Sequence, residues 1–154
     1  MKQSAKRVAK NLLAMTAVLA LSACATAPEV YDFDNSKTVS TSYDQTWEKV
    51  ITYFSSNNIP IKTLEKDSGL VVAEIARLDG RSISRYADCQ ASMLDVLEGG
   101  KADYNVFVRR AADGTTVTVN TDFSATRRGV GTATSSFSDC NSKGVFEQEF
   151  LSQF

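Results

Sequence analysis

The sequence predicts an α+β domain in which an antiparallel sheet of four or five strands carries helices on one face. Polar and apolar residues alternate along 104–110 and again along 116–127, and an Asp113-Gly114 turn signal separates the two runs. Alternation with one apolar side is typical of an antiparallel sheet with one solvated face. Two segments with helical periodicity, one near Tyr43 and one at the C-terminal end, supply the layer that covers the other face.

The composition is that of a globular protein without histidine chemistry. The chain has 154 residues, 17 Lys and Arg, 18 Asp and Glu, three Cys and no His, and 43% of its residues are hydrophobic. This length and apolar content suit one folded domain rather than a disordered chain. The lack of His excludes Ser-His-Asp and Cys-His nucleophile activation as well as His-ligated zinc.

The N-terminal residues have the pattern of an export signal. Four basic residues and no acidic residue precede the apolar stretch Leu12–Leu21, and small residues follow it. A basic segment, a short apolar segment and small residues at a cleavage site predict a secretory signal peptide over residues 1–23. Ten helical residues span only about 15 Å, too short for a membrane-spanning helix. A buried amphipathic helix is the alternative that the pattern leaves open.

The residues Leu21-Ser22-Ala23-Cys24 resemble the lipobox of bacterial lipoproteins. The resemblance implies cleavage before Cys24 and attachment of fatty acyl chains, such as palmitate, to that residue. Two or three acyl chains anchor a protein stably, because each buried CH₂ contributes about 0.8 kcal/mol. By the sorting rule of this family, Ala25 after the cysteine implies the outer membrane of a diderm bacterium, and we expect the domain to face the periplasm.

Cleavage would leave an acidic protein. Removing residues 1–23 removes four basic side chains, so 13 basic and 18 acidic side chains remain, a net charge of −5. Such a surface has no net attraction for phosphate backbones or anionic headgroups, so nucleic-acid binding is disfavoured. Membrane attachment then depends on the acyl chains.

Two cysteines remain once Cys24 carries lipid. An even number of cysteines in an oxidising compartment predicts a disulfide between Cys89 and Cys140. Such a bridge would contribute about 4 kcal/mol by restricting the unfolded chain. Two separate buried thiols are the alternative, and the lack of a Cys-x-x-Cys spacing disfavours a redox-active pair.

The first half of the mature chain gives the clearest elements. We expect a lipidated tether over residues 24–35, a single domain over residues 36–154, and a first edge strand over residues 36–42. Apolar residues from Tyr43 to Phe54 recur on one helical face, and Ser42 with Gln45 forms a capping-box signature. We expect Trp47 and Phe54 to be core residues. A hairpin follows, with strands over residues 59–65 and 70–78.

The second half is less regular. Residues 79–103 show a weak pattern in which residues 93–97 form either a helical turn or a short strand, and residues 129–142 read as a loop. Phe146, Phe150 and Phe154 repeat at helical spacing and predict a C-terminal helix. Ser142, which precedes them, is a suitable N-cap for this helix. The predicted order is therefore β-α-β-β-β-β-α.

No constellation of catalytic residues is apparent. The acidic residues are scattered, so nothing selects a pair for glycoside hydrolysis, although a hydrolase stays open as an alternative. Gly129-Val130-Gly131 is too short for a dinucleotide-binding turn. The doublets 109–110 and 127–128 are either an anion patch or, more in keeping with strand ends, arginines paired with nearby acids. We predict no enzyme activity, no metal and no cofactor.

The segment 42–74 resembles a known domain. Its sequence Tyr-Asp-Gln-Thr-Trp-Glu-Lys-Val, then Ile-Pro-Ile and Lys-Asp-Ser-Gly-Leu-Val, is similar to the start of the helix-grip-like domains of small outer-membrane lipoproteins. The lipoprotein C subunit of the β-barrel assembly machinery (BamC) belongs to this group. The resemblance covers about a quarter of the chain, and it implies a helix-grip-like fold with a long helix against an antiparallel sheet.

These observations predict a non-enzymatic, lipid-anchored envelope protein that binds another envelope protein or acts as a scaffold. The alternative is the binding of a small hydrophobic ligand or lipid in a helix-grip pocket lined by Tyr53, Phe54, Val72 and Phe107. A third alternative is a structural protein that coats the membrane surface. The sequence leaves the partner unidentified.

Overall fold

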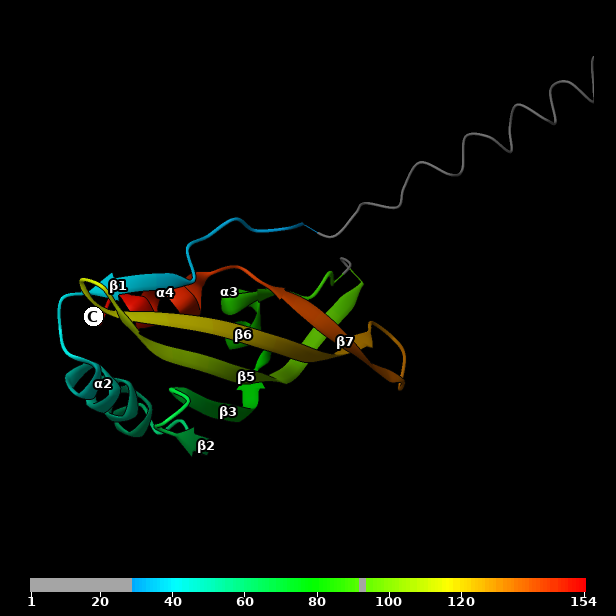
Figure 1. Cartoon of the computed structure of the whole chain (residues 1–154). Helices are drawn as coiled ribbons and strands as arrows, with labels where there is room; N and C mark the ends of the chain where they lie inside the picture. The colour runs from blue at the N-terminus through cyan, green and yellow to red at the C-terminus, as the bar shows by residue number, and fades with distance from the viewer. Residues whose placement is uncertain (1–28, 92–93) are drawn as a thin grey trace, which may run out of the picture.

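The computed structural model describes residues 29–91 and 94–154 and has an α+β architecture (Figure 1). The predicted signal peptide, the lipobox and the first part of the tether lie outside these residues. The described part contains seven strands and three helices: β1 (Ser36–Val39), α2 (Tyr43–Ser56), β2 (Ile61–Glu65), β3 (Leu70–Asp79), α3 (Gly80–Tyr86), β4 (Ala87–Asp88), β5 (Asp95–Ala111), β6 (Gly114–Gly129), β7 (Ser135–Ser142) and α4 (Val145–Leu151).

The sheet has the strand order β2-β3-β5-β6-β7-β4, and β1 pairs with the beginning of β6. All of these pairings are antiparallel. The antiparallel α+β class predicted from the sequence is confirmed, but the sheet has seven strands rather than four or five. The long hairpin of β5 and β6 forms its centre, and their far ends continue with β7 beyond the helices in Figure 1.

Helix α2 begins and ends as its sequence predicts. Ser42 accepts a hydrogen bond from the backbone N–H of Gln45, and the Gln45 side chain accepts one from the Ser42 N–H, which completes a capping box. Asn57 follows the last helical residue as the C-cap. Trp47 and Phe54 are buried, as predicted.

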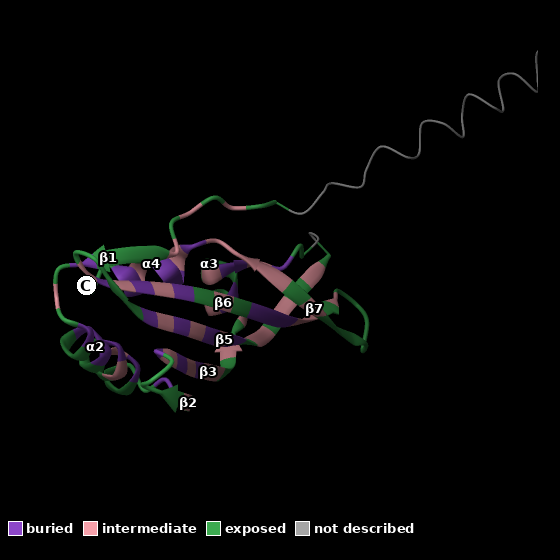
Figure 2. Cartoon of the chain, in the orientation of Figure 1, coloured by how far each residue is buried: buried purple, intermediate pink, exposed green. Residues whose placement is uncertain are grey.

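The core lies between the helices and one face of the sheet, and it is rich in aromatic rings. The ring centroid of Tyr104 on β5 lies 4.1 Å from that of Phe146 on α4 and 6.1 Å from that of Phe54 on α2. Phe54 and Phe150 are 5.6 Å apart, so α2 and α4 meet over the same strands. Figure 2 shows the resulting alternation of buried and half-buried residues along β5 and β6. These contacts fill the space between α2 and the sheet.

Helix α3 occupies part of the segment in which the sequence showed only a weak pattern. The Asp79 carboxylate caps it by accepting hydrogen bonds from the N–H groups of Arg81 and Ser82, both at 2.9 Å. The hydrogen bonds from Ser82 hold the pKa of Asp79 below its ordinary value. Ile83 is fully buried beneath the helix, against Gly100 of β5.

Strand β7 corrects a second expectation, because residues 135–142 form a strand where a loop was predicted. Six of its residues pair with β6, and Asn141 and Ser142 pair with β4. Its sequence, SSFSDCNS, has almost no apolar periodicity. The side-chain pattern of β7 therefore does not predict a strand. Backbone pairing with β6 and the cross-link through Cys140 stabilise it.

The N-cap of the C-terminal helix α4 lies two residues after the predicted cap, Ser142. Gly144 takes the N-cap position with φ of +74°, a left-handed conformation that glycine adopts easily. A Cβ at this position would also lie 2.3 Å from the ring of Phe33, so the end of the tether packs directly on the glycine. Ser142 instead accepts a hydrogen bond from the Gly144 N–H at 3.1 Å.

Candidate functional site

The sheet face opposite the helices is left uncovered by them (Figure 1). It carries polar and charged side chains that pair with one another, such as Lys62 with Glu74 at 3.3 Å and Lys101 with Asp103 at 2.8 Å. The hydrogen bond to Asp103 raises the pKa of the Lys101 ammonium group above its ordinary value. We call this surface the outer face of the sheet.

A hollow of about 590 Å³ opens on this face beside the irregular pairing of β3 with β5. Its walls come from three strands and from Phe137 on β7, and it is lined by Ala76, Arg77, Leu78, Asp79, Glu98, Gly99, Gly100, Lys101, Thr126 and Phe137. Apolar surface from Leu78 and Phe137 lies beside positively and negatively charged side chains. We call this feature the outer hollow.

Two irregularities in the strands produce the outer hollow. The register of β3 and β5 shifts between Ile75 and Leu78, and that of β5 and β6 shifts between Leu97 and Gly99. Such bulges bend a strand and increase its twist. A Cβ on Gly99 would lie 2.6 Å from the carbonyl oxygen of Leu78, so the close approach of these strands requires glycine there.

Exposed apolar side chains gather where β5, β6 and β7 extend beyond the helices. Leu94, Val96, Val130 and Phe137 are exposed by 71%, 48%, 66% and 77%. The N–H of Val130 donates to the carbonyl oxygen of Leu94 at 2.7 Å, which holds the two segments together. We call these four residues the distal tip. The sequence offered one signal for it, an isolated Phe137 among small and polar residues, which the loop interpretation overlooked.

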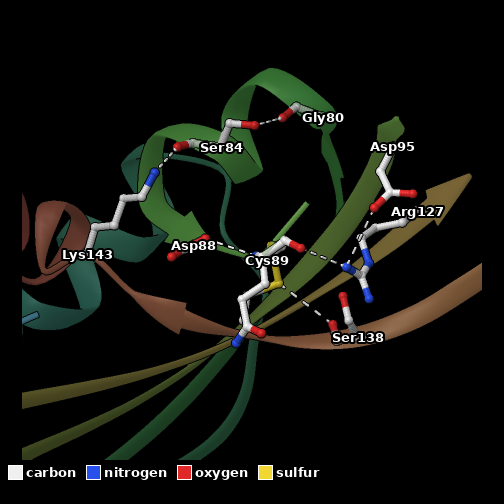
Figure 3. Close-up of a disulfide and its surroundings, with 10 residues drawn as sticks. Gly80, Ser84, Asp88, Cys89, Asp95, Arg127, Ser138 and Lys143 are labelled. Carbon is white, nitrogen blue, oxygen red and sulfur yellow. Dashed lines mark hydrogen bonds and ion pairs between the residues drawn. A yellow bond between two sulfur atoms is a disulfide. The ribbon is translucent and has the colours of Figure 1, made fainter. Parts of the chain in front are cut away.

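The predicted disulfide joins Cys89, just after β4, to Cys140 on β7, 51 positions further along the sequence (Figure 3). Cys89 is buried and belongs to the main core cluster. The bridge ties the loop after α3 to the strand that carries Phe137. This confirms the predicted pairing and rules out two separate thiols in this structure.

Polar contacts around the disulfide connect the same segments of the chain (Figure 3). Lys143 donates from its side chain to the carbonyl oxygen of Ser84 at 2.7 Å, and its backbone N–H donates to Tyr86 at 2.9 Å. Arg127 donates to the carbonyl oxygen of Gln90 at 3.0 Å. The disulfide is thus one part of a junction between α3, β4, β6 and β7, with a structural role.

The structure separates the four residues predicted to line a ligand pocket. Phe54 is fully buried on α2, and Tyr53 beside it packs with its ring centroid 4.8 Å from that of Phe150. Val72 and Phe107 alternate along their strands with buried residues that face the helices, so they lie on the outer face. The sheet therefore stands between the two pairs, and the four residues do not share a cavity.

The two arginine doublets are occupied by local partners. Arg128 contacts Glu98 at 2.8 Å, and Arg127 lies 4.0 Å from Asp95. The Arg110 guanidinium lies over the ring of Tyr43, 4.2 Å from its centroid, and Arg109 lies over Phe107. This arrangement agrees with strand-end arginines paired nearby rather than with one anion patch.

The described residues meet neither the requirements of a membrane-spanning helix nor those of a metal site. None of the helices among them is long and apolar enough to cross a membrane. No group of three or more Cys, Asp or Glu side chains in the same residues is arranged to hold a metal ion. No protein-family model matches this chain, and no curated protein sequence matches it.

Proposed function

We propose that this chain is a lipid-anchored protein of the bacterial outer membrane whose periplasm-facing domain binds another envelope protein through the outer face of its sheet. The observation that carries the proposal is the outer hollow with the exposed Phe137 at its margin. Aromatic side chains beside a hollow are favoured anchors of protein interfaces, because they bury a large area at small entropic cost.

The charges around the hollow suit a protein partner. Arg77 and Lys101 lie among its lining residues with Asp79 and Glu98, so both signs of charge surround apolar surface. Interfaces between proteins commonly combine an apolar centre with a polar rim of this kind. Lys101 and Glu98 already have partners within the chain, so they can take part without leaving a buried charge unpaired.

The open edge of β7 supports an extended segment of the partner as the binding element. In the described part of the chain, β7 pairs with β6 over Ser135–Cys140 on one side and with β4 only at Asn141 and Ser142 on the other. A strand edge with free N–H and C=O groups can accept an added strand. Phe137 lies on this portion of β7, so an added strand would lie next to the hollow.

The anchor and the fold type are further parts of the proposal. The lipobox-like residues 21–24 support acylation of Cys24, and the lack of sequence matches leaves this resemblance as its main support. The packing of α2 against an antiparallel sheet supports a helix-grip-like domain. The alternative of a ligand pocket between α2 and the sheet is disfavoured, because aromatic rings fill that space.

The experiment is cross-linking and affinity capture of the lipidated full-length protein from its native membrane. Wild type, Phe137→Ser and the matched control Leu64→Ser are compared, because Leu64 is also exposed (48%) but lies on the edge strand β2, away from the hollow. We expect a stoichiometric partner with the wild type and with Leu64→Ser, and a loss of it with Phe137→Ser. Equal recovery with all three variants, or no partner with any, overturns the interface.

A further inference from the structure

The distal tip holds most of the exposed large apolar side chains of the described residues. Six large apolar side chains are exposed among the described residues, and four of them, Leu94, Val96, Val130 and Phe137, form the distal tip. A fifth, Val30, is 88% exposed and lies in the tether. Exposed apolar residues that gather at one end of a molecule, rather than scattering singly, mark a contact surface.

The tip is also free of unpaired charge. Residues 129–138, which run from the end of β6 into β7, contain no charged side chain. The nearest cations at this end, Arg127 and Arg128, lie beside Asp95 and Glu98. A segment without charges can enter the boundary between lipid headgroups and acyl chains, where an unpaired charge would be costly.

The tether brings this end of the molecule close to its anchor. The side-chain amide of Asn141 on β7 donates to the carbonyl oxygen of Glu29 at 3.0 Å, so the first described residue lies beside the C-terminal end of β7. Glu29 is five positions after Cys24 in the sequence, and a fully extended chain of five residues spans at most about 18 Å. From Asn141 to Phe137, four residues along β7, the strand covers only about 13 Å.

We propose that the end of the distal tip formed by Leu94, Val96 and Val130 inserts into the surface of the lipid bilayer that holds the acyl chains of Cys24, while Phe137, which lines the outer hollow, stays available to the protein partner. This inference rests on the proposed lipid anchor and adds a second, protein-mediated contact with the same membrane. The anchor keeps Asn141 within a short distance of the headgroups. The distal tip is the part of the described surface suited to enter them, because Asp95, the charged residue between Leu94 and Val96, lies beside Arg127. The outer face then stands along the membrane at a fixed orientation, because two contacts rather than one hold the protein at the bilayer.

The test uses the lipidated protein in vesicles of phosphatidylethanolamine and phosphatidylglycerol, with or without bromine on the acyl chains. Val130→Trp reports on the tip, and Leu64→Trp is the matched control because Leu64 is also an exposed apolar residue on a strand away from the tip. The sole native tryptophan, Trp47, is only 2% exposed, so the wild type supplies the background to subtract. Flotation with the vesicles and the intact mass of the N-terminal peptide report separately on the anchor.

We expect the fluorescence added by Val130→Trp to shift to the blue and to lose intensity in brominated vesicles, while that added by Leu64→Trp changes in neither respect. A protein that floats with acylated Cys24 but shows no quenching at position 130 overturns the tip contact and leaves the anchor standing. A blue shift without quenching means that protein, a second copy or a partner, covers the tip, and it also overturns the proposal. Unmodified Cys24 and no flotation overturn the anchor and this inference together.

Discussion

The hydroxyl of Ser142, at the end of β7, donates a hydrogen bond to the Glu147 carboxylate of α4 at 2.7 Å. Glu147 is only 1% exposed, and the same carboxylate oxygen accepts a second hydrogen bond from Thr121 of β6. Its other oxygen is buried without a partner in the described structure. One buried carboxylate thus links the last helix to two neighbouring strands.

Removing this acceptor is expected to destabilise the domain. Glu147→Ala leaves two hydroxyl groups without their partner and opens a cavity, so we expect the free energy of unfolding to fall by about 3 kcal/mol. Glu147→Gln keeps one carbonyl oxygen for Ser142 and Thr121 and loses less. Urea denaturation of both variants measures the difference.

The matched control for this pair is Glu149→Gln on the same helix. Glu149 is 43% exposed and forms an ion pair with Arg85, which is also largely exposed. Exposed ion pairs contribute less than about 1 kcal/mol. If Glu149→Gln costs as much as Glu147→Ala, burial of Glu147 is not what makes it important.

The second prediction concerns the disulfide. We expect Cys89→Ser and Cys140→Ser each to lower the free energy of unfolding by about 4 kcal/mol, because either change opens the same loop of the unfolded chain. The double variant should lose no more than either single variant. Thermal and chemical denaturation under non-reducing conditions test this, and clearly additive losses would show that the two sulfur atoms act independently.

The elements that could be predicted from the sequence are those that local side-chain signals determine. The capping box of Ser42 and Gln45 and the apolar face of α2 are local signals, and the helix begins and ends where they indicate. Helix α3 was missed because its sequence, GRSISRY, contains glycine and two serines, which favour helices weakly, and its stability comes from the Asp79 cap and the burial of Ile83. Strand β7 was missed because pairing with β6 stabilises it.

The sequence did not show that the four residues of the predicted pocket lie on opposite faces of the sheet. In the run Leu70–Leu78 both faces of the strand carry apolar residues, so the pattern does not tell which residues face the helices. Val71 and Ala73 do, and Val72 therefore does not. The disulfide was predictable because only two cysteines remain after Cys24, whereas the outer hollow depends on register shifts that no sequence pattern reveals.

A third prediction tests the close packing of α3 on the sheet. A Cβ on Gly100 would lie 2.1 Å from the carbonyl oxygen of Ser124 and 2.8 Å from Cδ1 of Ile83. Because a backbone atom cannot move aside as a side chain can, we expect Gly100→Ala to lower the free energy of unfolding by about 1–3 kcal/mol. Gly129→Ala is the control, since its nearest neighbour would be the Thr132 side chain at 3.3 Å. Equal stability of the two variants in urea would contradict this packing.

A fourth prediction concerns alkaline pH. Burial raises the pKa of Tyr104 well above its ordinary value of about 10. The unfolded chain then releases the phenol proton of Tyr104 at lower pH than the folded protein does. The free energy of unfolding is therefore not reduced by this group below about pH 10, and it falls as the pH rises further. Tyr104→Phe should lessen the loss of stability between neutral and strongly alkaline pH. Urea midpoints across this range, with phenolate absorbance on the wild type, measure it, and parallel curves for the two proteins would contradict the assignment.

The last prediction separates the anchor from the domain. Cys24→Ser removes the sulfur that would carry the diacylglycerol group, and we expect the protein either to leave the membrane fraction or to remain as an uncleaved precursor. Folding should be unaffected, because Cys89 and Cys140 form their bridge without Cys24. Fractionation of membranes together with intact-mass analysis measures the outcome, and the Cys89→Ser variant is the control that loses a cysteine but keeps the anchor. Unchanged membrane association of a cleaved Cys24→Ser protein would mean that other contacts, such as the distal tip, hold the protein at the membrane without lipid.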